Sequence, residues 1–248
     1  EYTTSQLKVE YVTNCPDSLN PSLINYGDKI ADPSSKVKKE GYTLAGWYQN
    51  ETFQGNAWNF NDPVYSSMTL YAKWNINSYT VKYHANGGTP EPDDKQFAYG
   101  SKISVPTVTR TGYSLDGWYT TADFKEGTKV YFDTYTMPAS NIDLYAKWIV
   151  GSYYVHYHAN GGVPDPGNVP VEFGTKIKQP TDPAKEHYDF KGWYTDASYK
   201  TKFNFDQTMP AYDLDAYAKF DMTMYTIKFD TQGGKETIPD QQRTYQQK

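Results

Sequence analysis

A ten-residue segment recurs four times along this chain at a nearly constant spacing. The copies are LKVEYVTNCP at 7–16, YTVKYHANGG at 79–88, YYVHYHANGG at 153–162 and YTIKFDTQGG at 225–234, and successive copies begin 72, 74 and 72 residues apart. Self-similarity at a fixed period indicates a tandem array of one small structural unit. No other feature of the sequence limits the possible folds as strongly.

Three more landmarks follow each complete copy in the same order. They are YGDKI, YGSKI and FGTKI, then GYTLAGWY, GYSLDGWY and HYDFKGWY, and last MTLYAKW, IDLYAKW and LDAYAKF. This order predicts a divergent first repeat at 5–74, a second at 79–148, a third at 153–220 and the truncated start of a fourth at 225–248. The predicted structural markers are Trp47, Trp74, Trp118, Trp148, Trp193, Gly87, Gly88, Gly161 and Gly162.

Several segments within a repeat alternate apolar and polar residues with a period of two. In the second repeat this alternation places Val81 and Tyr83 on one face of a predicted strand. Gly117, next to Trp118, predicts a β-bulge. No long segment has helical periodicity, although a short helical turn is compatible with the pattern. The predicted fold class is therefore mainly β or α+β.

Aromatic side chains are the expected source of core packing. A unit of roughly 70 residues has a marginal core, and this chain has 25 tyrosines and 6 tryptophans. For the second repeat we expect a core of Tyr83, Tyr99, Tyr113, Trp118, Tyr119, Phe132 and Trp148. The connections NINS, IVGS and DMTM are too short for flexible linkers, which predicts an elongated, semi-rigid array.

The four landmarks together resemble a known family. The pattern Y-x-V-x-Y/F before N/Q-G-G, then Y/F-G-x-K-I, G-Y-x-x-x-G-W-Y and L-Y-A-K-W, is similar to the Listeria-Bacteroides repeat, the B-repeat of internalin-type proteins. The resemblance covers nearly the whole chain. It implies small β-grasp units, ubiquitin-like or SUMO-like, arranged in tandem in secreted or cell-wall-attached proteins of the bacterial surface. The implied roles are spacing, adhesion and support of host contact.

The paired glycines are interpreted as a turn and not as a phosphate site. Gly88 is followed by TPEPDD and Gly162 by VPDPGN, whereas a phosphate loop leads into a helix with Lys and Ser or Thr. Glycine adopts positive φ without steric cost, which we take as the reason for the pair. In the first repeat Cys15 and Pro16 replace the glycines, so a different turn is predicted there.

The sequence contains no clear chemical site. His156 and His158 are two residues apart on a predicted strand and could form half of a metal site, but Lys82 and His84 occupy these positions in the second repeat. We therefore expect exposed strand residues, no metal and no cofactor. No catalytic constellation stands out, and near-identical small units offer no asymmetric cleft, so an enzyme is not expected.

Charge and hydropathy exclude other partners. The net charge of −5 provides no basic face for nucleic acid, and no apolar run is long enough to span a membrane. The first residues lack the features of a signal peptide and the sequence stops within a repeat, so we interpret the chain as a segment of a longer protein. Cys15 is the single cysteine, which excludes an internal disulfide.

Tyrosines that do not recur between repeats are the candidate partner-binding residues. They are Tyr65, Tyr131, Tyr135, Tyr154 and Tyr212. We predict a nonenzymatic spacer that supports adhesion from a bacterial cell surface, with a host or surface protein or a glycan as partner. The alternative prediction is a carbohydrate-binding module that uses these exposed tyrosines.

The fourth repeat lacks the segments with which its first strand should pair. We expect residues 225–248 to be poorly ordered, or to borrow a sheet edge from the third repeat or from a neighbouring molecule. Weak self-association through this segment is the corresponding expectation about partners.

Overall fold

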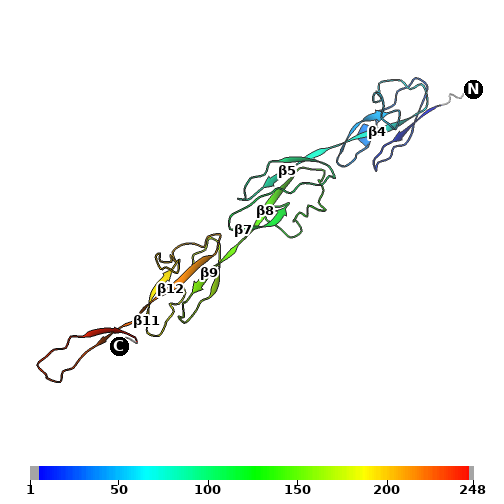
Figure 1. Ribbon diagram of the computed structural model, residues 1–248. Coiled ribbons are helices and arrows are strands. Elements are labelled where there is room, and N and C mark those ends of the chain that lie inside the picture. Colours follow the sequence, from blue (N-terminus) through cyan, green and yellow to red (C-terminus); the bar gives the residue numbers. More distant parts are fainter. Residues whose placement is uncertain (1–5, 246–248) are drawn as a thin grey trace, which may run out of the picture. The chain divides into compact units, whose positions relative to one another are not determined.

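A computed structural model describes residues 6–245 (Figure 1). Residue 5, the predicted start of the first repeat, and residues 246–248 of the predicted fourth lie outside the described residues. Each of the three complete repeats forms one four-stranded sheet, and the fourth segment forms a two-stranded sheet. The predicted mainly-β class with tandem small units is confirmed.

The same four strands occur in each complete repeat. The first has β1 (Leu7–Val12), β2 (Ser22–Ile24), β3 (Tyr42–Tyr48) and β4 (Met68–Ile76), with a short 3-10 helix, η1, at Ser34–Lys36. The second has β5 (Ser78–His84), β6 (Lys95–Ala98), β7 (Tyr113–Tyr119) and β8 (Ile142–Val150). The third has β9 (Ser152–His158), β10 (Asn168–Glu172), β11 (Tyr188–Tyr194) and β12 (Leu214–Met222), and β13 (Met224–Ile227) and β14 (Gln241–Thr244) follow.

The first and last strands of each repeat are neighbours in the centre of the sheet. The strand orders are β2-β1-β4-β3, β6-β5-β8-β7 and β10-β9-β12-β11. The central pairs β1 with β4, β5 with β8 and β9 with β12 are parallel. This topology is compatible with a β-grasp unit, although the crossover of the first repeat contains only η1 as a helical element.

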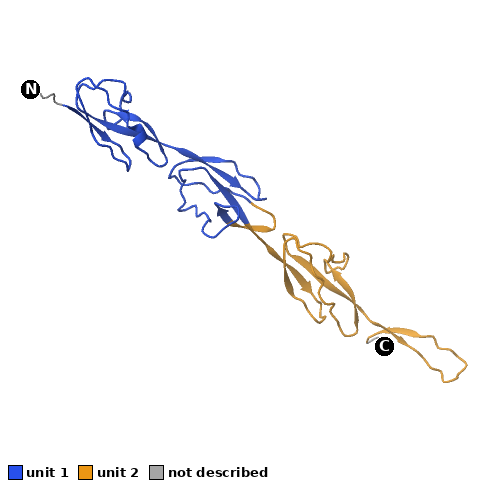
Figure 2. Ribbon diagram, turned by 180° about the vertical axis from the view of Figure 1, so that it is seen from behind, with its two compact units in different colours: residues 1–108, 117–147 blue, residues 109–116, 148–248 orange. Residues whose placement is uncertain are grey.

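Two compact units divide the chain (Figure 2). Unit 1 comprises residues 1–108 and 117–147, and unit 2 comprises residues 109–116 and 148–248. The boundary passes through β7 and β8, so unit 1 contains the sheet of the first repeat and unit 2 contains the sheet of the third.

A buried tryptophan packs against a buried face of the central pair in each repeat. Val81 and Leu144 have no exposed surface, and Trp118 is 1% exposed. The Tyr83 ring meets the Trp118 ring edge to face, with centroids 5.5 Å apart. Tyr119 is also buried, whereas four other predicted core residues are only half-buried, namely Tyr99, Tyr113, Phe132 and Trp148.

A β-bulge lies directly before the buried tryptophan, as the glycine at this position predicted. The pairing of β3 with β4 shifts between Leu44 and Gly46, and the pairing of β11 with β12 shifts between Phe190 and Gly192. Gly46 and Gly192 occupy the position of Gly117 in their repeats and have φ of 142° and 112°. Glycine is needed here because a side chain seldom adopts these angles.

The paired glycines form the predicted turn, but the two positions require glycine for different reasons. Asn86 and Gly87 have φ of 51° and 86°, and the N–H of Gly88 donates to the carbonyl of Ala85 over 3.0 Å, which describes a type I′ turn. The second glycine does not have positive φ. A Cβ on Gly162 would lie 2.7 Å from Phe220 Cζ and 2.8 Å from Pro183 Cβ. Conformation therefore explains the first glycine only, and close packing explains the second.

The first repeat keeps the asparagine of this turn and replaces the rest. Asn14 has φ of 51°, whereas Cys15 is outside the left-handed region. Pro16 has no N–H to close the turn, and instead the Thr13 hydroxyl donates to the carbonyl of Asp17 over 2.5 Å. The predicted change of turn at Cys15 and Pro16 is confirmed.

One alternative for the fourth segment, a sheet edge borrowed from the third repeat, is wrong, whereas pairing with a neighbouring molecule stays a prediction. β13 pairs antiparallel with β14, which occupies the place of the second strand in a complete repeat. The sequence of β14, QQRT, has no apolar alternation that would predict a strand. Among the described residues, this two-stranded sheet lacks the parallel strand that pairs with the first strand in a complete repeat. Ile227 and Phe229 correspond to the buried residues Val81 and Tyr83, yet they are 43% and 40% exposed.

We predict that Gly162→Ala destabilises the third repeat by about 1–3 kcal/mol, because the added methyl group overlaps Phe220 and Pro183. Urea unfolding of the third repeat measures this change. The control is Val163→Ala at the next residue, where the native side chain is 73% exposed and the expected change is within about 0.5 kcal/mol. Equal stability of the two variants would contradict the packing explanation.

Candidate functional site

The parallel pair formed by the first and last strands is the feature that all three repeats share most closely. In the second repeat Val81 lies beside Ile142 and Tyr83 beside Leu144. The chain therefore begins and ends each repeat on adjacent strands that run in the same direction (Figure 1). We refer to these two strands as the parallel pair.

A side chain extends the hydrogen bonding at the start of each parallel pair. The residue is on the last strand or just before it, and its oxygen accepts from a backbone N–H of the first strand. The three bonds are Lys8 N to Ser67 Oγ at 3.0 Å, Thr80 N to Asn141 Oδ1 at 2.8 Å and Tyr154 N to Asp213 Oδ1 at 2.8 Å.

An asparagine closes the other end of each parallel pair. Its Nδ2 donates to an alanine carbonyl of the last strand, from Asn14 to Ala72 at 2.9 Å, from Asn86 to Ala146 at 2.7 Å and from Asn160 to Ala218 at 2.7 Å. This cross-strand bond explains why Asn14 persists where both glycines are lost. The recurrence of asparagine was visible in the sequence, but its partner more than fifty residues away was not.

Two repeats add a histidine–carboxylate bridge on the exposed face of the parallel pair. His84 Nε2 lies 2.6 Å from Asp143 Oδ1, and its ring is stacked on Tyr145 with centroids 4.5 Å apart. His158 Nε2 lies 2.7 Å from Asp215 Oδ1, and its ring is stacked on Tyr217 with centroids 4.2 Å apart. Both bridges connect the first strand to the last.

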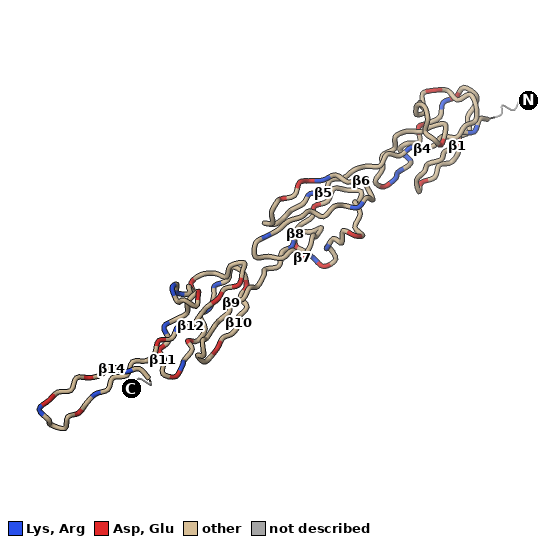
Figure 3. The backbone as a smooth tube through the Cα atoms, in the orientation of Figure 1, with Lys and Arg blue, Asp and Glu red and all other residues tan. Residues whose placement is uncertain are grey.

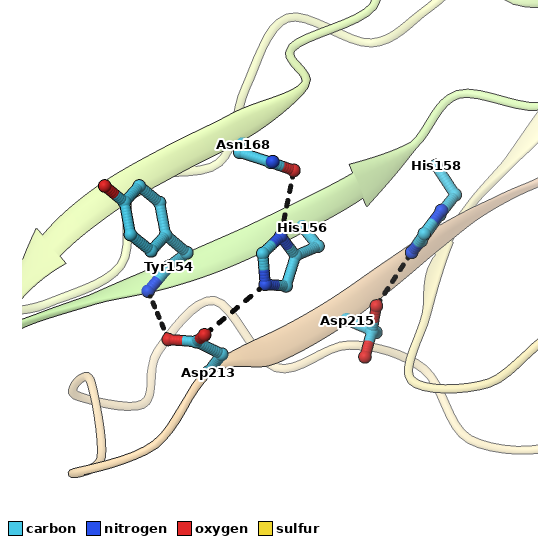
Figure 4. A network of polar contacts seen from close by, with 6 residues as sticks. All are labelled: Tyr154, His156, His158, Asn168, Asp213 and Asp215. Carbon is cyan, nitrogen blue, oxygen red and sulfur yellow. Dashed lines mark hydrogen bonds and ion pairs between the residues drawn. The ribbon is translucent and has the colours of Figure 1, made fainter.

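His156 has a separate environment, shown in Figure 4. Its Nδ1 donates to Asn168 Oδ1 over 2.8 Å, and its Nε2 lies 3.5 Å from Asp213 Oδ2. The pKa of His156 is raised above its usual 6.5, first because Asn168 accepts this bond and further because the carboxylates of Asp213 and Asp215 are close. The charged ring is therefore favoured in the folded state.

The two histidines do not combine into a metal site. His156 faces Asn168 and Asp213, whereas His158 faces Asp215 (Figure 4). Among residues 6–245, no group of three or more His, Cys, Asp or Glu side chains is arranged to hold a metal ion. The side chains are 31% and 41% exposed, as expected for residues on the outer face of a strand.

A single residue, which we name the junction residue, joins the parallel pair of one repeat to the next. Inside unit 1 it is Asn77, between β4 and β5. Its N–H donates to the carbonyl of Gly41, and its carbonyl accepts from the N–H of Tyr99, both over 2.9 Å. The Tyr99 ring covers Gly41 so closely that a Cβ there would lie 2.2 Å from it. Tyr99 of the second repeat therefore packs on the first repeat, and its predicted place in the core of the second repeat is wrong.

The same contacts recur inside unit 2. Gly151 donates to the carbonyl of Gly112 over 2.8 Å and accepts from the N–H of Phe173 over 2.8 Å, and the Phe173 ring covers Gly112. At the third junction residue, Thr223 donates to the carbonyl of His187 over 2.9 Å. His187 replaces the glycine there, and its ring stacks on Tyr245 with centroids 3.5 Å apart. The predicted four-residue connections thus mostly belong to strands.

Four of the five candidate tyrosines are exposed, in three different repeats. The exposed fractions are 59% for Tyr65, 67% for Tyr131, 45% for Tyr154 and 64% for Tyr212. Tyr135 differs, because it is half-buried and burial raises its pKa. Tyr26, which holds the position of Tyr99 in the first repeat, is 72% exposed, and its ring centroid lies 5.1 Å from that of Tyr65. Tyr154 adjoins a polar network, because its backbone N–H donates to Asp213 Oδ1 over 2.8 Å.

Charged residues of both signs are interspersed along the backbone of each repeat (Figure 3).

Cys15 is a free, half-buried thiol packed against the core of the first repeat. Within the part of the chain that the structure describes, no helix is long and apolar enough to cross a bilayer.

Comparison with known proteins places these features in a family. Residues 8–73, 79–147 and 153–219 each match the family model of the Listeria-Bacteroides repeat domain. A protein of Evansella cellulosilytica described as a Gly-rich membrane protein is 35% identical over 230 residues, which are 92% of this chain and 26% of that protein. A second protein of the same organism, described as a membrane protein, is 33% identical over 224 residues, 90% of this chain and 33% of its own length.

Internalin H of Listeria monocytogenes is 37% identical over 129 residues, which are 50% of this chain and 22% of that protein. The chain therefore spans about a third or less of the length of each of these relatives.

Replacing Asn14 by Asp tests the asparagine bond. Asp keeps the shape and tolerates the left-handed backbone, but it cannot donate to the carbonyl of Ala72, so we expect a loss of about 1 kcal/mol in the stability of the first repeat. Chemical unfolding measures it. Asn20→Asp, an equal change of charge on an exposed loop, is the control. A loss in both variants would indicate a general charge effect instead.

The stability of the third repeat should depend on pH through His156. Its pKa is raised on folding, so the stabilisation is fully present below pH 6.5 and is lost as the pH rises through the raised value. Unfolding between about pH 5.5 and about 8.5 should show decreasing stability, and His156→Gln should flatten the change. An NMR titration that places the pKa of His156 at or below 6.5 would contradict this.

Proposed function

Because the family model matches most of its length, this chain belongs to the Listeria-Bacteroides repeat family, and we propose that it is a nonenzymatic, tension-bearing spacer in a bacterial cell-surface protein. In this role the repeats hold a host-binding or surface-binding module away from its attachment point and support adhesion. The partner is a protein or glycan of the host or surface.

The parallel pair is the observation that carries this proposal. A force along the chain pulls the start of the first strand and the end of the last strand in opposite directions. Because the two strands are adjacent and parallel, such a force slides one along the other and loads all their hydrogen bonds together. A hairpin pulled from its open end breaks one bond after another and resists far less.

Side-chain bonds at both ends of the parallel pair support the same role. In the first repeat Lys8 bonds to Ser67 at one end, and Asn14 bonds to the carbonyl of Ala72 at the other. These bonds protect the ends of the strands, where fraying would begin. The junction residue then passes the force directly from the last strand of one repeat to the first strand of the next, as at Asn77.

The family and the repetition support the proposed location and the proposed lack of catalysis. Relatives are described as membrane proteins and as an internalin, which supports a place at the cell surface. The exposed faces vary between repeats, whereas the buried tryptophan, the asparagine bond and the parallel pair are shared. Such a division suits a scaffold better than an enzyme.

A carbohydrate-binding module is the second candidate. It is favoured by the exposed ring of Tyr154, which lies beside the imidazole of His156 in a network with Asn168 and Asp213. Binding of sugars and transmission of force are compatible in one chain, because a sugar would contact exposed side chains of the parallel pair, whereas force loads the backbone hydrogen bonds between its two strands.

Tyr99→Ala tests whether the junction couples successive repeats. Loss of the ring uncovers Gly41 and weakens the contacts around Asn77, so we expect the first and second repeats to reorient more independently. Backbone 15N relaxation measured separately for the two repeats reports this change. Tyr26→Ala is the matched control, because Tyr26 holds the same position in the first repeat and is exposed. Unchanged relaxation in Tyr99→Ala would contradict a stiff junction.

A further inference from the structure

The exposed face of the parallel pair in the third repeat differs from the same face in the other two. Alternation with buried Val155 and Tyr157 places Tyr154, His156 and His158 on this face. At the positions of Tyr154, His156 and Asp213 the first repeat has Lys8, Glu10 and Ser67, and the second has Thr80, Lys82 and Asn141. The fold therefore does not require the residues that the third repeat presents here.

These side chains are held in place before any ligand is present. Asp213 Oδ1 accepts the backbone N–H of Tyr154 at 2.8 Å, and Asn168 Oδ1 accepts from His156 Nδ1 at 2.8 Å (Figure 4). The rings of Tyr154 and His156 are nearly parallel, with an interplanar angle of 19° and centroids 6.0 Å apart. Fixed polar groups lose little conformational entropy on binding, which favours recognition.

The face also retains unused hydrogen-bonding capacity. Tyr154 is 45% exposed, and across residues 6–245 no hydrogen bond involves the hydroxyl of its ring. The side chains of Asp213 and Asp215 are 49% and 50% exposed, so each carboxylate can accept further bonds. A tyrosine ring, two carboxylates, an imidazole and an amide thus occur together on one open surface (Figure 4).

We propose that this face of the third repeat, comprising Tyr154, His156, Asn168 and Asp213, binds a neutral sugar. Carboxylate and amide oxygens accept hydrogen bonds from neighbouring sugar hydroxyl groups, the Tyr154 hydroxyl both donates and accepts, and the Tyr154 ring covers the apolar C–H surface of a pyranose. This inference deepens the carbohydrate-binding alternative and does not depend on the spacer role.

Charge and polarity favour this ligand class over others. The carboxylates of Asp213 and Asp215 disfavour phosphate, sulfate and uronic acids, and the charged form of His156 is already paired, because its Nε2 lies 3.5 Å from Asp213 Oδ2. An apolar ligand would bury the Asp213 carboxylate and the Asn168 amide without compensation. A neutral sugar satisfies these groups and matches the mixture of rings and polar atoms.

The test is an NMR titration of the 15N-labelled chain with a neutral hexose trisaccharide, an N-acetylhexosamine trisaccharide and a uronic acid trisaccharide, each to about 10 mM, with glycerol as a hydroxyl control. A neutral trisaccharide should shift the amide signals of Tyr154, His156 and Asp213. The uronic acid sugar and glycerol should shift them little.

The matched variant is the double substitution Tyr154→Thr with His156→Lys, which installs the residues of the second repeat on the same strand and so preserves the fold. It should weaken binding about tenfold, a change of about 1.4 kcal/mol. The control Lys82→Ala, at the position of His156 in the second repeat, should leave binding unchanged. The proposal is overturned if neutral sugars cause no shifts, if the double variant binds equally well, or if the shifts map to another repeat. None of these outcomes would affect the 15N relaxation test of Tyr99→Ala, which concerns the spacer role.

Discussion

The parallel pairing of the first and last strands is the interaction on which each repeat depends. It places strands that are widely separated in sequence side by side, so their contact closes a loop that spans most of the repeat. The central tryptophan packs on the buried face of this pair through Val81 and Tyr83 and their counterparts. The asparagine after the first strand then fixes the last strand by a bond to its backbone. Core, turn and junction are all arranged around these two strands.

The arrangement separates what must be constant from what can vary. The central tryptophan and the asparagine after the first strand recur, whereas the outer face carries Lys8 and Glu10 in the first repeat and Tyr154 and His156 in the third. Substitution on that outer face leaves the sheet intact. A tandem array of this kind can therefore acquire binding surfaces in single repeats while every repeat retains the same mechanical role.

Much of the fold could be predicted from the sequence because its strongest signals are local and repeated. The alternation around Val81, the turn at Asn86 and Gly87 and the bulge before the tryptophan each depend on a few adjacent residues. The parts that could not be predicted depend on distant partners. The packing of Gly162 against Phe220, the bond from Asn14 to Ala72 and the Tyr99 ring on Gly41 join residues far apart in the chain. For the same reason the exposed tyrosines could be named, but the polar network beside Tyr154 could not.

Stretching single molecules from their two ends tests the central claim most directly. If the parallel pair bears tension, each of the three complete repeats should unfold in one step, at a force well above that needed when the same repeat is pulled through the ends of its last antiparallel hairpin, for example through Tyr42 and Ile76 in the first repeat. Asn14→Asp should lower the unfolding force of the first repeat when the chain is pulled from its ends. Equal forces in the two pulling directions, or no effect of the substitution, would contradict the account.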